Sequence, residues 1–148
     1  MYELSVTRLI DAPPARVWDA MVNRTNEWWC PRPWRAEMDF GSRQPGGFSM
    51  AVMHGPDGEV NEHPGCLLAW DEGRRFAMTD AVQEGLQPAG PFMLGIWEIE
   101  PEGSGTRYTA RARHWREEDC RTHEAMGFAE GWGTCADQLK ALCEGQSC

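Results

Sequence analysis

One histidine and a few oxygen-bearing side chains are the residues of this sequence best suited to chemistry. His114 ends a stretch of alternating character and shares a predicted face with Tyr108, and Asp80 or Glu98 could reach the same space. A histidine in such a place can act as a general base or can orient a ligand by a hydrogen bond. The commoner role of a buried histidine is structural. His114 is therefore a weak candidate for a catalytic residue.

Two pairs of residues have the spacing of a metal chelate, His63 with Cys66 and Cys120 with His123. A structural zinc site usually needs four such ligands, and no Cys-x-x-Cys pair occurs. The sequence also has no Gly-x-Ser-x-Gly elbow, and Gly46-Gly47 lacks the lysine and hydroxyl residue of a phosphate loop. We therefore expect no metal, no cofactor and no nucleophilic catalysis.

Large apolar side chains offer a different kind of site. The sequence holds 8 tryptophans, whose rings suit both a packed core and the wall of a pocket with a polar handle. Plain core packing is the alternative for each residue. The candidate ligand-binding residues are Trp18, Trp28, Trp29, Phe48, Met50, Phe76, Met78, Tyr108, His114, Phe128, Gly131 and Trp132.

Alternation of polar and apolar residues predicts a series of β-strands separated by glycine- and proline-rich turns. The predicted strands are 2–10, 34–40, 47–54, 59–70, 74–82, 91–100 and 105–115. Short turns imply antiparallel neighbours, because a parallel crossover needs a dozen or more residues. The longest connection, 83–91, could serve as a lid.

The same alternation assigns side chains to the two faces of the sheet. On the last strand Arg107, Thr109, Arg111 and Arg113 should face solvent, which places Tyr108, Ala110, Ala112 and His114 inside. Elsewhere Phe48, Met50 and Val52 share one face, as do Phe76 and Met78. The two alanines should leave space on the inner face.

Three segments are predicted to be helical. Pro13-Pro14 begins a short helix over 15–22, a second short helix covers 26–29, and a long amphipathic helix covers 117–143. The long helix contains Gly127, Gly131 and Gly133, and each glycine costs about 0.5–1 kcal/mol relative to alanine. We expect the flank with Gly131 to take close approach of the sheet or of a ligand.

Composition restricts the class of protein. A chain of 148 residues is expected to form a single domain over 1–148. Its net charge of −9 argues against nucleic acid and against anionic membrane surfaces. No run approaches the roughly 20 apolar residues of a membrane span, and the N-terminus does not read as a signal peptide. The 6 irregularly spaced cysteines, Cys148 among them, then suggest reduced thiols and a cytoplasmic location.

Several local motifs, in the predicted order of elements, resemble those of one superfamily. The stretch from Ile10 to Ala20 resembles the opening signature of START-like (SRPBCC) proteins, which include the birch pollen allergen. Trp28-Trp29-Cys30-Pro31, Pro45-Gly46-Gly47-Phe48, Gly55-Pro56-Asp57-Gly58 and the 127–132 motif resemble the branch related to the activator of the heat-shock-protein-90 ATPase.

The resemblance implies an α+β helix-grip fold. In it a curved antiparallel sheet of six to seven strands wraps around a long C-terminal helix, and two short helices follow the first strand. Members of the superfamily commonly enclose an apolar cavity between sheet and helix. Some bind lipids or hormones, and others are aromatase/cyclase-type enzymes.

The function expected first is binding of a small hydrophobic or aromatic molecule between the sheet and the C-terminal helix. One alternative is a cyclase, dehydratase or hydrolase that uses His114 and a pocket carboxylate. Another is a stress-related partner of a chaperone, although the eukaryotic co-chaperone has an additional N-terminal domain to which no segment here corresponds. Homodimer formation is left open, and no nucleic-acid partner or membrane insertion is expected.

Overall fold

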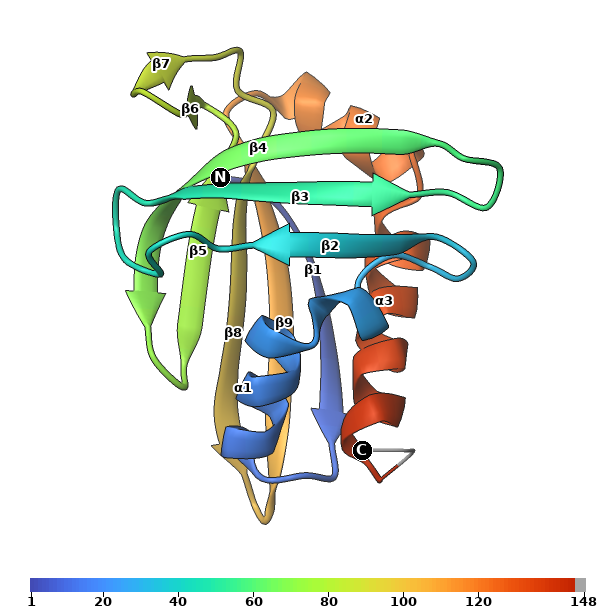
Figure 1. Ribbon diagram of the computed structural model, residues 1–148. Helices are drawn as coiled ribbons and strands as arrows, with labels where there is room; N and C mark the ends of the chain where they lie inside the picture. The colour runs from blue at the N-terminus through green and yellow to red at the C-terminus, as the bar shows by residue number, and fades with distance from the viewer. Residues whose placement is uncertain (146–148) are drawn as a thin grey trace.

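The computed structural model describes residues 1–145 and contains one large antiparallel sheet with helices on its concave side (Figure 1). The order of its seven strands is β1-β9-β8-β5-β4-β3-β2. Their bounds are β1 (Tyr2–Ile10), β2 (Arg35–Asp39), β3 (Phe48–His54), β4 (Val60–Asp71), β5 (Arg75–Thr79), β8 (Leu94–Glu102) and β9 (Gly105–His114).

The remaining elements are short strands and helices. They are the hairpin β6 (Val82–Gln83) with β7 (Gln87–Pro88), the helices α1 (Pro14–Asn23), α2 (Glu117–Ala125) and α3 (Phe128–Cys143), and the 3-10 turn η1 (Thr25–Glu27). This is the predicted α+β helix-grip fold. The predicted loop 83–91 forms part of the small hairpin. Among the described residues no helix has the length and apolar character needed to cross a bilayer.

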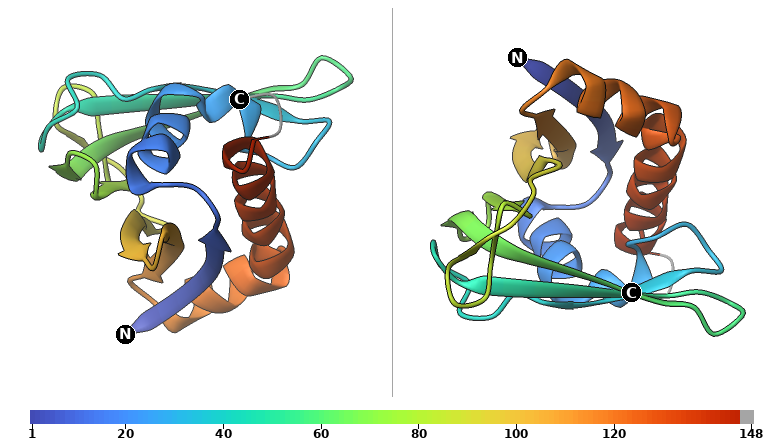
Figure 2. Two further views of the ribbon diagram at one scale, coloured as in Figure 1. Left: turned by 90° about the horizontal axis from the view of Figure 1, so that it is seen from below. Right: turned by 90° about the horizontal axis from the view of Figure 1, so that it is seen from above.

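The sheet is strongly bent, and β4 belongs to both of its parts. In Figure 1, β1, β9, β8 and β5 run along one direction, whereas β2, β3 and the adjacent part of β4 run across it. The register of β4 with β5 shifts between Leu67 and Ala69, and such a bulge bends a strand. Viewed along the molecule, α1 lies inside the curl and α3 closes its open side between β1 and the β2–β3 part (Figure 2).

Polar contacts fasten α3 to the N-terminal strand. Arg8 Nε donates to Asp137 Oδ1 at 2.7 Å, and Lys140 Nζ donates to the carbonyl of Leu9 at 2.9 Å. The backbone N–H of Asp11 donates to Glu144 Oε2 at 2.8 Å. These contacts hold the helix at the sheet edge while its apolar face packs into the core.

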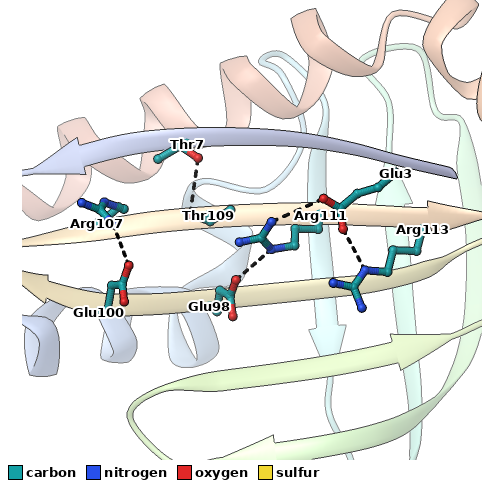
Figure 3. A network of polar contacts seen from close by, with 8 residues as sticks. All are labelled: Glu3, Thr7, Glu98, Glu100, Arg107, Thr109, Arg111 and Arg113. Atoms are coloured by element: carbon teal, nitrogen blue, oxygen red, sulfur yellow. Dashed lines mark hydrogen bonds and ion pairs between the residues drawn. The ribbon is translucent and has the colours of Figure 1, made fainter. Parts of the chain in front are cut away.

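The convex face of β1, β9 and β8 carries the arginines that were predicted to face solvent. Figure 3 shows Arg111 between Glu98 and Glu3, with Nε–Oε1 and Nη1–Oε2 distances of 2.8 and 3.4 Å. The hydrogen bond from Arg113 is the main reason that the pKa of Glu3 is lowered. Because Glu98 belongs to this network, the expectation that it could reach a pocket on the inner face is wrong.

The predicted inner face is confirmed for β9 and β5 but is wrong for β3. Ala51 and Met53 lie inside, opposite Met38 and Ala36 of β2, so Phe48 and Met50 are on the convex side. The error has a physical cause. The set with the larger side chains was assigned to the core, whereas the side of the strand that borders the cavity carries Ala51 beside Met53.

The long C-terminal helix is interrupted at Gly127. This residue has φ 92° and ψ 37°, a left-handed conformation that separates α2 from α3. A Cβ at Gly131 would meet no atom within 4 Å, so the predicted close approach at Gly131 is wrong. Only Gly133 is tight, because a Cβ there would lie 3.0 Å from Arg8 Nη2. Gly127 thus suits the left-handed turn between α2 and α3, whereas Gly133 lies close to the flexible end of the ion-paired Arg8 side chain.

Substitutions of Gly127 and Gly131 should have opposite effects on stability. Gly131→Ala should raise the free energy of unfolding by about 0.5–1 kcal/mol, since alanine is the better helix former and the added methyl meets open space. Gly127→Ala should lower it by about 1 kcal/mol or more, because a Cβ disfavours the left-handed conformation. Chemical denaturation of both variants tests the assignment, and equal losses of stability would contradict it.

Candidate functional site

A cavity of about 420 Å³ lies on the concave side of the sheet. Its lining comes from β2, β3, β4, β5, β8, the segment after η1 and the α2–α3 junction. The lining residues are Met21, Thr25, Trp28, Trp29, Met38, Phe40, Ala51, Met53, His63, Pro64, Gly65, Phe76, Met78, Thr79, Asp80, Phe92, Met93, Trp97, His123, Met126 and Trp132. Its size is within the range of small-molecule pockets, and its lining is mostly apolar.

Stacked aromatic rings form one wall of the cavity. Phe76 and Trp97, paired across β5 and β8, stack at 5.1 Å with an interplanar angle of 15°. Trp132 of α3 stacks on Trp97 at 5.4 Å and 18°, and Trp29 meets both tryptophans edge-on. A Cβ at Gly95 would lie 2.5 Å from the Trp97 ring. The glycine therefore gives the indole the room to lie flat.

Residue Gln138 of α3 fixes the segment that carries Trp28 and Trp29. Its amide nitrogen donates to the carbonyls of Trp28 and Cys30 at 2.7 and 2.8 Å. Cys30 has φ 80°, unusual for a residue with a side chain, and its N–H donates to Cys135 Sγ at 3.2 Å. Trp28 itself donates from Nε1 to the carbonyl of Ala20 at 3.0 Å. The segment is held by α3 and by α1, so its tryptophans form a fixed wall.

Most polar groups that border the cavity are engaged with the protein. Thr25 and Thr79 donate their hydroxyls to the carbonyls of Met21 and Met93. Asp80 Oδ1 accepts the backbone N–H groups of Phe92 and Met93 at 2.8 and 3.4 Å. Asp80 thereby shapes the connection that supplies two lining residues. His63 is exposed at the rim, and Met126 is 71% exposed there.

A pair of buried histidines stands at the α2 side of the cavity. His114 Nδ1 lies 3.2 Å from the carbonyl oxygen of Tyr2, and His114 Nε2 lies 2.9 Å from His123 Nδ1. His123 borders the cavity, whereas His114 lies behind it. The rings of Phe92, Phe128 and Trp132 surround His123 at centroid distances of 5.0, 5.0 and 5.8 Å.

This environment favours neutral imidazole at His123. Burial, and secondarily the neighbouring His114, lowers the pKa of His123 from 6.5 to about 4. No carboxylate hydrogen-bonds either ring among residues 1–145. At neutral pH His123 therefore presents an uncharged polar group to the cavity.

The structure brings five of the sequence-predicted residues to the cavity and places the others elsewhere. The five are Trp28, Trp29, Phe76, Met78 and Trp132. Those outside the lining are Trp18, Phe48, Met50, Tyr108, His114, Phe128 and Gly131.

The positions of the predicted residues that lie outside the cavity have structural reasons. Trp18 packs on Trp70 and Phe76 and donates Nε1 to Glu72 at 2.8 Å. Tyr108 is fully buried beside Trp28, and burial raises its pKa well above the ordinary value. Phe128 packs behind His123 and Trp132. For His114, both ring nitrogens are engaged, which contradicts a role as acid or base in the cavity.

Sequence reasoning missed Trp97, His123 and the small side chains of β3. Trp97 could have been found, because strand alternation pairs it with the inner residues Phe76 and Ala110. His123 carries no local signal, since its role depends on where α2 ends. Within residues 1–145 no group of three or more His, Cys, Asp and Glu side chains could hold a metal. Cys30, Cys66, Cys120 and Cys135 are free thiols, and Cys148 lies outside the described residues.

The lowered pKa of His123 predicts a dependence of stability on pH. Above pH 6.5 the imidazole of His123 is neutral in both the folded and the unfolded chain. Between about pH 6.5 and 4, His123 is protonated in the unfolded chain but stays neutral in the folded chain. The free energy of unfolding therefore falls, as the pH is lowered, by up to about 1.4 kcal/mol per pH unit. His123→Phe should remove this part of the slope.

Denaturant titrations across that pH range measure the effect. Phe92→Leu is the control, because it removes a ring beside both imidazoles without removing a titrating group. Identical slopes for wild type and His123→Phe would show that His123 does not stay neutral.

Comparisons with known proteins agree with this architecture. A crystal structure of a protein from Nitrosomonas europaea is 35% identical, with a TM-score of 0.84 over 95% of this chain and 93% of that one. A Mycobacterium smegmatis protein is 25% identical, with a TM-score of 0.77 over 95% and 90% of the two chains. The solution structure of the Aha1 dimer from Colwellia psychrerythraea is 15% identical with a TM-score of 0.66 over the full length of both chains, which shows the fold alone.

The comparison with curated proteins finds none that matches this chain. The model of one family, described as Activator of Hsp90 ATPase homolog 1-like protein, matches residues 11–144. A match over this length, together with the relative at 35% identity, covers nearly all the elements described above. The chain therefore belongs to the family of Activator of Hsp90 ATPase homolog 1-like proteins.

Proposed function

We propose that this protein binds a small, mostly apolar aromatic molecule in the cavity between the curved sheet and the C-terminal helices. The observation that carries the proposal is the wall of stacked rings from Phe76, Trp97 and Trp132 beside about 420 Å³ of space. Because Trp97 lies between Phe76 and Trp132, an aromatic ligand would meet the edge of its ring, and edge-to-face aromatic contacts contribute about 0.5–1.5 kcal/mol beyond the burial of apolar area.

The apolar area that a small ligand can bury in this cavity corresponds to a modest binding affinity. A ligand that buries about 200 Å² of apolar surface gains roughly 5 kcal/mol at 25 cal/mol per Å². The fixed wall limits the ordering cost of binding, because its tryptophans are already held by one another and by Gln138. We therefore expect dissociation constants from micromolar to millimolar for simple aromatic probes.

Other expectations from the sequence have less support. His114 does not border the cavity, and its Nδ1 is paired with the carbonyl of Tyr2, so a catalytic role for it has little support. Contact with a chaperone stays a prediction that the family description suggests. Homodimer formation also stays a prediction, since the relative described as a dimer is 15% identical. A cytoplasmic location also stays a prediction.

Two neighbouring residues of β3 provide a matched test of the cavity. Ala51 borders it, and Val52 is on the opposite face of the same strand. N-phenyl-1-naphthylamine, whose fluorescence rises in apolar surroundings, should bind the wild type at one site. Ala51→Phe should weaken this binding about tenfold or more by filling the space, whereas Val52→Phe should retain it.

Fluorescence titration gives the affinities, and thermal unfolding confirms that both variants fold. Unchanged binding by a folded Ala51→Phe protein would place the probe elsewhere. Absence of any saturable binding to the wild type would count against the proposed function.

A further inference from the structure

The imidazole of His123 is one of the few polar groups in a mostly apolar cavity wall. Its side chain is 8% exposed and borders the cavity. Nδ1 is engaged with His114, whereas Nε2 has no hydrogen-bond partner among residues 1–145. Among the described residues, Tyr108 Oη is fully buried without a hydrogen-bond partner, but His123 Nε2 is not in that class. The free nitrogen is therefore accessible to solvent, on a side chain that lines the cavity.

The hydrogen bonds of the pair determine where the protons lie. The carbonyl of Tyr2 can only accept, so His114 Nδ1 must carry the proton between them. In a neutral ring His114 Nε2 is then an acceptor, and His123 Nδ1 must donate to it. A neutral His123 that is protonated on Nδ1 has a lone pair on Nε2. The chain from Tyr2 through His114 thus fixes His123 as a hydrogen-bond acceptor toward the cavity.

We infer that the ligands of this cavity are aromatic molecules with a hydrogen-bond donor, such as a phenolic hydroxyl or a ring N–H, which donates to Nε2 of His123. This inference rests on the proposed function. His114 is a positioning residue, because it sets the tautomer of His123 without touching the ligand. The aromatic body packs against Trp132 and Trp97, and Trp132 lies next to His123.

The same geometry argues for recognition rather than proton abstraction. A general base must hold the proton that it takes, and enzymes usually place a carboxylate behind the imidazole to stabilise its charge. Here the relay ends at the backbone carbonyl of Tyr2. Burial also lowers the pKa of His123 to about 4, far below that of a phenol. The proton therefore stays on the ligand, and His123 accepts a hydrogen bond.

Competing acceptors on the cavity wall are fewer than its size suggests. Asp80 is the main one, although its Oδ1 already accepts two backbone N–H groups. The hydroxyls of Thr25 and Thr79 donate to backbone carbonyls but can still accept, and Thr79 Oγ1 already accepts the N–H of Ala81. His63 is exposed at the rim, where water competes for its nitrogens. The test must separate His123 from Asp80.

The tautomer can be measured without any ligand. Long-range ¹H–¹⁵N correlation spectra of the histidine side chains distinguish a protonated from an unprotonated ring nitrogen. At pH 7 we expect unprotonated Nε2 and protonated Nδ1 for His123. In His114→Phe the constraint is gone, and His123 should show a mixture of tautomers. A wild-type His123 protonated on Nε2 would overturn the inference, whatever binds in the cavity.

The ligand class can be tested with 2-naphthol, 2-methoxynaphthalene and naphthalene, which share a ring system and differ in the donor. NMR titration of backbone amides should show that 2-naphthol binds the wild type about tenfold more tightly than its methyl ether. His123→Phe should bind all three with similar affinity. His54→Phe is the matched control, because His54 pairs with Glu37 outside the cavity lining, and it should keep the preference for 2-naphthol.

The possible results separate the inference from the function on which it rests. Equal binding of the three probes to the wild type would overturn the inference and leave the cavity's function standing. Loss of the preference in Asp80→Asn but not in His123→Phe would assign the acceptor to Asp80 and would also overturn it. Failure of every probe, N-phenyl-1-naphthylamine included, would remove the proposed function and the inference with it. If His123→Phe does not fold, the His114→Phe variant supplies the same comparison through the tautomer.

Discussion

The aromatic rings beside the cavity stack on one another and therefore cannot rotate to fill it. The binding site depends on this constraint. Trp97 lies between Phe76 and Trp132, and Trp29 meets both tryptophans edge-on. A rotation of any one ring would break contacts with two or more others. Close packing elsewhere in the core, with Trp28, Tyr108 and Leu139 almost fully buried, then coexists with an unfilled cavity of about 420 Å³.

The polypeptide holds this wall from both ends. On the sheet side, Gly95 lets the Trp97 ring lie flat, and the bulge in β4 turns β2 and β3 across the cavity. On the helix side, Gln138 ties the Trp28–Cys30 segment to α3, while Arg8 and Lys140 tie α3 to β1. The left-handed Gly127 redirects the chain so that α2 brings His123 to the rim of the same wall.

The fold could be predicted because its signals are local. Alternation in β5 and β9, the turn residues between strands and the short motifs near residues 10–20 and 127–132 each point to the same arrangement. The site was harder to predict, because a cavity inverts the usual rule that the more apolar face of a strand is the inner one. Ala51 and Met53 face the cavity while Phe48 and Met50 face away, and the alternation of the strand alone does not decide between the two sets.

The histidine pair shows a second limit of sequence reasoning. His114 was placed on the correct face, but its role depends on His123 of another element and on a backbone carbonyl of the first strand. No spacing in the sequence encodes a contact between a strand end, a helix and an N-terminal carbonyl. Glycines were similarly ambiguous, because a helix break at Gly127 and an open flank at Gly131 look alike in a one-dimensional pattern.

The most direct test of this account is a crystal structure of the protein with 2-naphthol. The account predicts that the naphthalene ring lies against Trp97 and Trp132 and that its oxygen is within hydrogen-bond distance of His123 Nε2, with the walls unmoved. A ring bound on the convex face, or a naphthol oxygen directed away from His123 within the cavity, would contradict it.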